Sequence, residues 1–324
     1  MQEINGLEFK FNSSIKNIYE YLKNNLVSFR FDHIASGLQL FTEEIITTWI
    51  NNAIKEFNCK TVVFSGGISM NVKANMKINE IPEIEKMFVC GGGGDSSLSI
   101  GSCYAYAESN GISSKPLKDM YLGIGCSYSL NEIKKLSTKY NITKFSSSKQ
   151  IVDRLLEGKI IATCFGRAEM GPRALGNRSI IADPRKRENI EKINQKIKNR
   201  DFWMPFAPVI LQEFQNEILK NPKDTPSPHM TIGFDTIEGK ERIPVGVHQY
   251  DGTARPLILK KNTNERLWEV IKEFYDHTKI PALVNTSFNL HGEPMVNSFN
   301  DALHVFERSG LDSIWFDNHI IDKK

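Results

Sequence analysis

Two stretches of the sequence each have the order of a short apolar strand, a glycine-rich turn and a helix. The first is KTVVFSGG (60–67), and the second is FVCGGGGDSSLSIGSCYAYAESNG (88–111). In such units the loop that leaves the strand lies at the carboxyl edge of a sheet, where backbone amides and a helix N-terminus favour bound anions. This repeated order restricts the chain to α/β folds and predicts an anion-binding edge.

The rest of the chain continues the alternation of strands and helices. Apolar residues at helical spacing predict an amphipathic helix over 38–58. Strands are predicted within 158–166, 207–212 and 281–287, and helices within 187–199, 264–279 and 300–310. The proline-bearing stretch 112–123 reads as a connector, so we expect domains at 1–114 and 115–324, and a surface loop at 219–234.

Composition excludes several classes of protein. The 324 residues suggest about two domains, and a net charge of +3 does not indicate a duplex nucleic-acid binder. No apolar stretch is long enough for a membrane span, and no secretory signal is recognisable, so we expect a cytoplasmic protein without a membrane partner. The five cysteines contain no CxxC pair and are expected to be reduced and mostly buried.

Arginine is concentrated in GRAEMGPRALGNRSIIADPR (166–185), which contains four arginines and three glycines. Arg173 and Arg178 are five residues apart on an irregular, glycine-bearing stretch, so both side chains can enter one cavity. Guanidinium groups match phosphate or carboxylate oxygens bidentately. A salt-bridged surface loop, with Glu169 and Asp183 as partners, explains the same spacing, and the spacing alone does not separate the two readings.

Three further polar clusters lie at strand boundaries. Lys198 and Arg200 share one side of a strand-like alternation before PFAPVI, His248, Asp251 and Arg255 surround a DGT turn, and NTSFN (285–289) follows a strand. Polar side chains at strand ends are typical of ligand sites. Each cluster taken alone also fits a turn with satisfied hydrogen bonds.

Taken in order, the motifs carry a family resemblance. SGGISMNVKAN, GGGGDSSLSIG, GRAEMGPRALGNRSI, NQKIKNRDFWMPFAPVI, DGTARP and NTSFNLHGEPMV resemble the ATP-dependent O-carbamoyltransferases of antibiotic and nodulation-factor biosynthesis. The resemblance covers roughly residues 33–318. Six motifs in order are far more specific than one glycine loop.

The resemblance implies a partial actin-like ATPase (Kae1-like) domain followed by a YrdC-like twisted-sheet α/β domain. The YrdC-like domain is expected to form carbamoyl-adenylate from carbamoyl phosphate and ATP with Mg²⁺. The Kae1-like domain is expected to pass the carbamoyl group to a hydroxyl of a small metabolite or sugar. The expected anion cradle is Arg167, Arg173, Arg178, Lys198 and Arg200, with Ser287, Asn289, Arg255 and Glu169 as further ligand-binding residues. The expected nucleotide loops are Gly66, Gly67, Asn71, Asn75, Gly93 and Gly94, with Asp95 as a metal ligand.

One part of the family pattern is missing. Family members begin with a subdomain whose histidine motif supplies metal ligands, and this sequence has no histidine pair in helical register. Asp95 can also serve as a helix N-cap. We therefore expect a separate chain, or a homo-oligomer, to supply the missing half, and a divalent metal (Fe, Mn or Mg) at Asp95 only if that partner brings histidines.

Alternatives remain open at this point. One reading is that the chain forms carbamoyl-adenylate alone and releases it, and another is that it is a non-catalytic nucleotide-binding subunit of a carbamoyltransferase. A subunit of a tRNA-modifying complex is a third reading, although the near-neutral charge and the absence of a basic tail speak against a nucleic-acid partner. The acceptor cannot be read from these motifs.

Overall fold

A mixed eight-stranded sheet forms the centre of the C-terminal part of the chain. The computed structural model describes residues 3–11, 14–198 and 204–324, so the predicted site residue Arg200 lies outside the described residues. The strands lie in the order β5-β12-β11-β6-β7-β10-β8-β9, with parallel pairs only at β6–β11 and β8–β9. Their bounds are β5 Tyr140–Lys144, β6 Ile161–Cys164, β7 Ser179–Ala182, β8 Ala207–Leu211, β9 Leu257–Leu259, β10 Ala282–Ser287, β11 Ser313–Phe316 and β12 His319–Lys323.

Helices cover both faces of this sheet and enclose two hydrophobic cores. Along β7, Ile181 belongs to the core that includes α6 and α9, and Ile180 belongs to the core that includes α7 and α10. Successive strand residues point to opposite faces, so the alternation places one core on each side. The helical elements are α5 Leu130–Leu136, α6 Lys149–Leu156, α7 Glu188–Ile193, the π-helical turn η2 Asn194–Lys198, η3 Gln212–Glu217, α8 Gly239–Arg242, α9 Glu265–Thr278 and α10 Phe299–Arg308.

The predicted α/β class is confirmed, and local capping signals explain where α9 and α10 begin. The Asn264 side chain caps α9 by accepting from Leu267 N, and Ser298 with Asp301 forms a capping box at the start of α10. The strands predicted within 158–166, 207–212 and 281–287 are β6, β8 and β10. Lys198 lies in the helix predicted within 187–199, where it ends a π-helical turn, so the strand-like alternation predicted at Lys198 is wrong.

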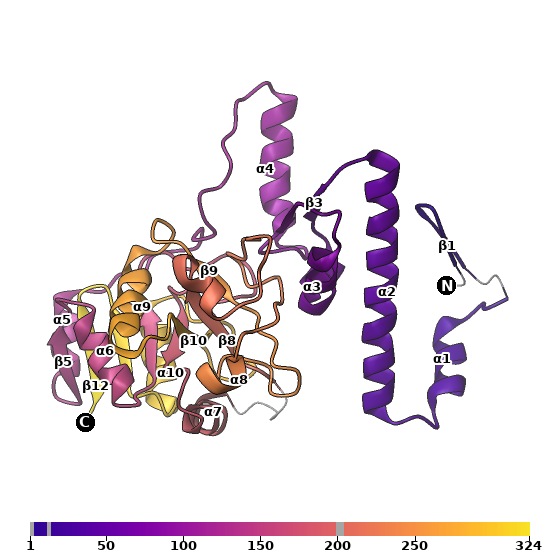
Figure 1. Cartoon of the computed structure of the whole chain (residues 1–324). Coiled ribbons are helices and arrows are strands. Elements are labelled where there is room, and N and C mark those ends of the chain that lie inside the picture. The colour runs from indigo at the N-terminus through magenta and orange to yellow at the C-terminus, as the bar shows by residue number, and fades with distance from the viewer. Residues whose placement is uncertain (1–2, 12–13, 199–203) are drawn as a thin grey trace.

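The N-terminal segment contains both strand–glycine–helix units. β3 (Thr61–Phe64) runs through glycines into the 3₁₀ turn η1 (Gly67–Met70) and α3 (Val72–Glu80), and β4 (Lys86–Val89) runs through Gly91 to Gly94 into α4 (Ser97–Ser109). β3 and β4 pair in parallel. The predicted amphipathic helix is the C-terminal part of α2 (Phe31–Phe57), which lies beside α1 (Ile18–Leu26) and the hairpin of β1 (Glu3–Asn5) and β2 (Glu8–Lys10) (Figure 1).

Much of the apolar surface of the N-terminal segment is exposed. α4 projects away from the rest of the molecule, and none of its residues is buried (Figure 1). Leu98 on α4 is 67% exposed, and Val63 on β3 is 72% exposed. Exposed patches of large apolar side chains typically mark contact surfaces.

The stretch 219–234, expected to be a surface loop, is largely buried and joins the two parts of the chain. Lys223 Nζ donates to Asn79 O (2.7 Å) and Ile81 O (2.6 Å), and Thr225 Oγ1 donates to Asn79 Oδ1 (2.8 Å). Gly233 N donates to Val72 O (3.3 Å). Lys223, one of the polar residues that suggested a surface loop, here satisfies backbone carbonyls at the C-terminal end of α3.

The thiols are less buried than expected. Cys126 and Cys164 are buried with their sulfur atoms 3.1 Å apart, whereas Cys59 and Cys103 are exposed and Cys90 is half-buried. All five are free thiols. Among the described residues, no helix combines the length and apolarity that crossing a bilayer requires.

Asp322 on β12 ties three elements together at one side of the sheet. Its carboxylate accepts hydrogen bonds from Arg154 Nε (2.8 Å) and Nη2 (2.7 Å) on α6, and from Ser313 Oγ on β11 (2.5 Å). Burial opposes the charged form, but these hydrogen bonds outweigh it and hold the pKa of Asp322 below its usual value.

The free energy of unfolding should therefore fall as the pH drops below about 4 towards the lowered pKa of folded Asp322, since the unfolded chain binds the proton more readily. We expect Asp322→Asn to flatten this pH dependence in urea unfolding between about pH 3 and pH 6. Glu44→Gln, at an exposed position of α2, is the control for loss of one carboxylate. An unchanged slope in Asp322→Asn would show that other carboxylates set the acid sensitivity.

Candidate functional site

A cavity of about 610 Å³ opens where five distant parts of the chain meet. Its walls come from the start of α3, from the arginine-rich loop between β6 and β7, from the end of η2, from the DGT turn, and from the loop after β10. The lining includes Val72, Lys73, Met76, Arg173, Lys198, Phe206, Gly233, His248, Asp251, Thr253, Arg255, Asn289, Leu290 and His291. We call this space the Lys198 cavity.

Lys198 is fixed at the wall of this cavity by the loop after β10. Its side chain is 1% exposed, and its ammonium group donates to Ser287 Oγ (3.1 Å), Asn289 O (3.0 Å), Ser287 O and Asn289 Oδ1. Ser287 Oγ also donates to Asn289 Oδ1 (2.7 Å). The two segments predicted to act together, KNR and NTSFN, therefore meet at Lys198.

Two predicted arginines reach the same cavity from different loops. Arg173 comes from the loop between β6 and β7, and Arg255 follows the DGT turn. The arginine loop is tightly placed: Gly171 has φ +103°, and a Cβ there would lie 3.0 Å from Gly91 O of the second glycine turn. Only glycine allows this backbone approach between the loop and the N-terminal segment.

The cavity carries an excess of positive charge. Among the described residues that line it, Lys73, Arg173, Lys198 and Arg255 carry positive charge and Asp251 carries the one carboxylate. Lys73 Nζ donates to Asp251 Oδ2 (2.7 Å), so the Asp251 carboxylate is already paired at the cavity wall. Cations converging on a half-enclosed cavity suit a phosphate-bearing ligand.

Arg178 and Glu169 lie elsewhere and organise the arginine loop. Arg178 is fully buried, and its guanidinium donates to the backbone carbonyls of Phe165, Asn177, Asn297, Ile124 and Gly166. Glu169 Oε1 accepts from the backbone N–H groups of Leu175 (2.8 Å), Asn177 (2.8 Å) and Arg178 (3.1 Å). These contacts hold the backbone of the arginine loop in place.

Arg167 also lies outside the Lys198 cavity. Its exposed side chain donates to Gly123 O (2.8 Å) and Leu122 O (2.5 Å). The expected five-residue cradle is thus divided. Arg173 and Lys198 line one cavity together with Arg255. Arg167 and Arg178 instead donate to backbone carbonyls, and Arg200 is outside the described residues.

The two predicted nucleotide loops pack against each other. Gly66 N donates to Gly93 O (2.7 Å), and a Cβ at Gly93 would lie only 2.2 Å from Ser69 Oγ. Among the described atoms, a Cβ built at Gly66, Gly67 or Gly94 would meet nothing within 4 Å, so these glycines border open space. This arrangement leaves the loop backbone accessible to a ligand.

The two asparagines of the first loop have structural partners. Asn71 Oδ1 caps α3 by accepting from Ala74 N (3.1 Å), and its amide pairs with Gln39 of α2. Asn75 Nδ2 donates to Ser69 O and Thr231 O, both at 2.7 Å. Asn75 therefore links the first glycine loop to the buried 219–234 stretch.

The described residues do not form a metal centre around Asp95. Asp95 is exposed in the turn before α4, and Ser96 is the residue at the N-cap position. Across the described ranges, no three histidine, cysteine, aspartate or glutamate side chains lie close enough to hold an ion. The residues of this chain alone do not fit a resident metal, and we derive no chemistry from one.

Sequence reasoning missed Lys73 and did not connect it with the DGT turn. Asp251 accepts from Lys73, from His248 Nδ1 (3.0 Å) and from Thr253 N and Oγ1 (3.0 and 2.7 Å). Burial opposes its ionisation, but the hydrogen bonds from Lys73 and Thr253 hold the pKa of Asp251 well below its usual range. The signal for Lys73 was present, because the residue belongs to the SMNVKAN motif.

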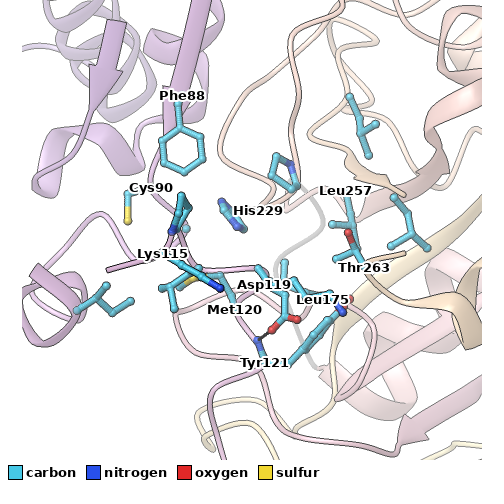
Figure 2. A pocket seen from close by; sticks show the side chains of 18 of the residues that line it. Phe88, Cys90, Lys115, Asp119, Met120, Tyr121, Leu175, His229, Leu257 and Thr263 are labelled. Atoms are coloured by element: carbon cyan, nitrogen blue, oxygen red, sulfur yellow. Dashed lines mark hydrogen bonds between the residues drawn. The ribbon is translucent and has the colours of Figure 1, made fainter. Parts of the chain in front are cut away.

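A second cavity of about 650 Å³ lies between the N-terminal segment and the sheet domain. Figure 2 shows its labelled side chains, with Phe88 and Cys90 near His229 and with Tyr121 beside Leu175 and Asp119. The His229 ring lies edge-on to Phe88 at 5.9 Å, and burial lowers its pKa. The lining is mostly apolar and does not include the predicted anion ligands.

Comparisons with known proteins agree on one family. The family model "Carbamoyltransferase C-terminus" matches residues 152–323, and "Carbamoyltransferase N-terminus" matches residues 4–104. An uncharacterised protein of Methanocaldococcus jannaschii is 38% identical over 90% of this chain and 56% of its own length. Nodulation protein NolO of Bradyrhizobium diazoefficiens is 30% identical over 90% of this chain and 54% of its own length.

The chain spans about half the length of the curated relatives it matches. Among solved structures, full-length HypF in its phosphate- and nucleotide-bound form matches with a TM-score of 0.36 and 15% identity. That match covers 55% of this chain and 24% of HypF, and it is too weak to support an inference. The family models are stronger, since the C-terminal model alone matches more than half of the 324 residues. The chain therefore belongs to the carbamoyltransferase family.

Proposed function

We propose that the Lys198 cavity binds carbamoyl phosphate and ATP and forms carbamoyl-adenylate. The observation that carries this proposal is the convergence of Arg173, Lys198 and Arg255 from three distant segments on one cavity. Family membership supports a carbamoyl group as the substrate fragment. ATP and carbamoyl phosphate are both polyanions, so closely placed cations are what their joint binding requires.

The proposed reaction has two chemical steps. Water cleaves carbamoyl phosphate to carbamate and phosphate, and a carbamate oxygen then attacks the α-phosphorus of ATP and displaces pyrophosphate. The sum is carbamoyl phosphate, ATP and water going to carbamoyl-adenylate, phosphate and pyrophosphate. Attack of one anion on another requires fixed positive charge and positioning, which the three converging cations supply.

The transfer step is proposed for the N-terminal segment. The open glycines Gly66, Gly67 and Gly94 are suited to hold the adenylate while a hydroxyl of a small metabolite or sugar attacks the carbamoyl carbon and AMP leaves. We propose that a complementary segment, on the same polypeptide or on another chain, covers the exposed faces of α2, β3 and α4 and completes this site. The exposure of Val63 and Leu98 supports that cover.

The first test is pyrophosphate release from ATP and Mg²⁺ with and without carbamoyl phosphate. We expect release to depend on carbamoyl phosphate and to fall about 10²-fold or more in the double variant Arg173→Ala, Arg255→Ala. The double variant Arg30→Ala, Arg187→Ala removes the same charge from exposed positions and should keep the wild-type rate.

The same assay distinguishes the competing functions. Pyrophosphate release without acceptor, followed by slow loss of the adenylate to AMP, favours an enzyme that works alone. ATP binding without pyrophosphate release, even with a family member's N-terminal region added, would refute the catalytic proposal and favour a non-catalytic subunit. AMP formation that requires a hydroxylated acceptor would support the transferase.

A further inference from the structure

Cleavage of carbamoyl phosphate by water needs a group that removes a proton from the water. Water is a poor nucleophile at neutral pH, and a positioned general base contributes about 10²- to 10⁴-fold. The cations of the Lys198 cavity cannot serve, because arginine stays protonated and the ammonium groups of Lys198 and Lys73 already donate to protein oxygens. A base must come from the other side chains of the lining.

His248 has the geometry of such a base. Its Nδ1 lies 3.0 Å from Asp251 Oδ1, and an ionised carboxylate only accepts hydrogen bonds, so Nδ1 must carry the proton. The neutral ring then has its lone pair on Nε2. A histidine held by a carboxylate, in a cavity with substrate-binding cations, is the arrangement that activates water or hydroxyl nucleophiles in many hydrolytic sites.

Asp251 is not itself suited to be the base. Its two oxygens already accept from Lys73, His248 and Thr253, and it stays ionised, which leaves little basicity. His291 also lines the cavity, from the exposed turn that contains Gly292. It is the competing base, and the experiment must separate it from His248.

Resting on the proposed function, we propose that His248 is the general base for hydrolysis of carbamoyl phosphate and that Asp251 and Lys73 are its positioning residues. Nε2 takes one proton from water, and the hydroxyl adds to the carbonyl carbon. The bond from that carbon to the phosphate oxygen then breaks. The leaving phosphate takes the proton back from His248, and the carbamic acid formed ionises to carbamate.

Lys73 links the His248–Asp251 pair to the N-terminal segment. It lies on α3, directly after the first glycine loop, and its ammonium reaches across to Asp251 Oδ2 at 2.7 Å. Because α3 and the DGT turn are about 180 residues apart in sequence, only docking of the N-terminal segment creates this contact. A shift of α3 would therefore loosen Asp251 and the ring that Asp251 orients.

Supplying carbamate directly tests whether His248 is the general base. Carbamate can attack ATP without prior hydrolysis of carbamoyl phosphate, so the step assigned to His248 is bypassed. Pyrophosphate release is measured for the full chain with carbamoyl phosphate and, separately, with ammonium carbamate. We expect His248→Ala to be about 10²-fold slower with carbamoyl phosphate and within about twofold of wild type with carbamate. His277→Ala, a histidine on α9 beside Glu273 and outside the cavity, should match wild type with both.

Variants of the positioning residues Lys73 and Asp251 should show a smaller loss of rate with carbamoyl phosphate than His248→Ala. Lys73→Met should lower kcat with carbamoyl phosphate about tenfold without a matching rise in KM, and Lys73→Arg should restore most of it. Asp251→Asn should behave like Lys73→Met or worse, since it also alters the DGT turn.

Each result has a definite meaning. If His248→Ala loses both activities equally, or keeps the wild-type rate with carbamoyl phosphate, His248 is not the base and the inference is overturned. If His291→Ala instead shows the selective loss that carbamate rescues, the base is His291. If wild type releases no pyrophosphate with either donor, the failure belongs to the proposed function.

Discussion

Replacing Lys198 by methionine should lower carbamoyl-phosphate-dependent pyrophosphate release by about 10²- to 10³-fold, the range seen when one fixed stabiliser of developing charge is removed. Lys198 is buried and held by Ser287 and Asn289, so its charge is in place before substrate binds. A fixed cation in a partly desolvated site stabilises the transition state more than a mobile surface lysine does. Methionine retains much of the side-chain length and removes the charge.

The control for Lys198→Met is Lys196→Met, which removes the same charge from an exposed position of the same π-helical turn. Pyrophosphate release and thermal unfolding should be measured on both variants. The prediction requires a large loss of rate in Lys198→Met at a temperature where it remains folded. A Lys198→Met enzyme that turns over at the wild-type rate would remove Lys198 from the site, and the Arg173 and Arg255 variants would then carry the proposal alone.

The sequence predicted the fold class and the meeting of distant motifs better than it predicted side-chain roles. Periodicity located β6, β8, β10 and the helices between them because each element buries one face or stripe. It could not show that Lys198 ends a π-helical turn, since one inserted residue in a helix leaves no clear pattern in a single sequence. The family motifs supplied the pairing of Lys198 with Ser287 and Asn289.

Two of the misplaced expectations, for the 219–234 stretch and for Arg178, share one physical cause. A polar segment is predicted to be exposed, yet polar groups can be buried wherever tertiary contacts supply their hydrogen-bond partners. The 219–234 stretch is buried because Lys223 and Thr225 bond to α3, and Arg178 is buried because five carbonyls surround it. Those partners lie far away in sequence, so local composition carries no trace of them.

Arg178 provides the second large expected effect, on stability and not on the chemical step. Arg178→Ala should lower the free energy of unfolding by about 3 to 5 kcal/mol, because it removes a fully buried cation and leaves buried carbonyls without their donor. Those carbonyls belong to Phe165, Asn177, Asn297, Ile124 and Gly166, which lie on three separate segments. Urea unfolding of the wild type and the variant measures the difference.

The comparison with Arg173→Ala separates a scaffold arginine from a ligand arginine. Arg173 lines the Lys198 cavity, so its removal should lower the rate of pyrophosphate release far more than it lowers the free energy of unfolding. Arg178→Ala should show the reverse order, with most of its activity loss explained by the unfolded fraction. If Arg178→Ala is as stable as wild type yet inactive, the guanidinium must leave its carbonyls to bind the anion, and the cradle expected from the sequence would include it after all.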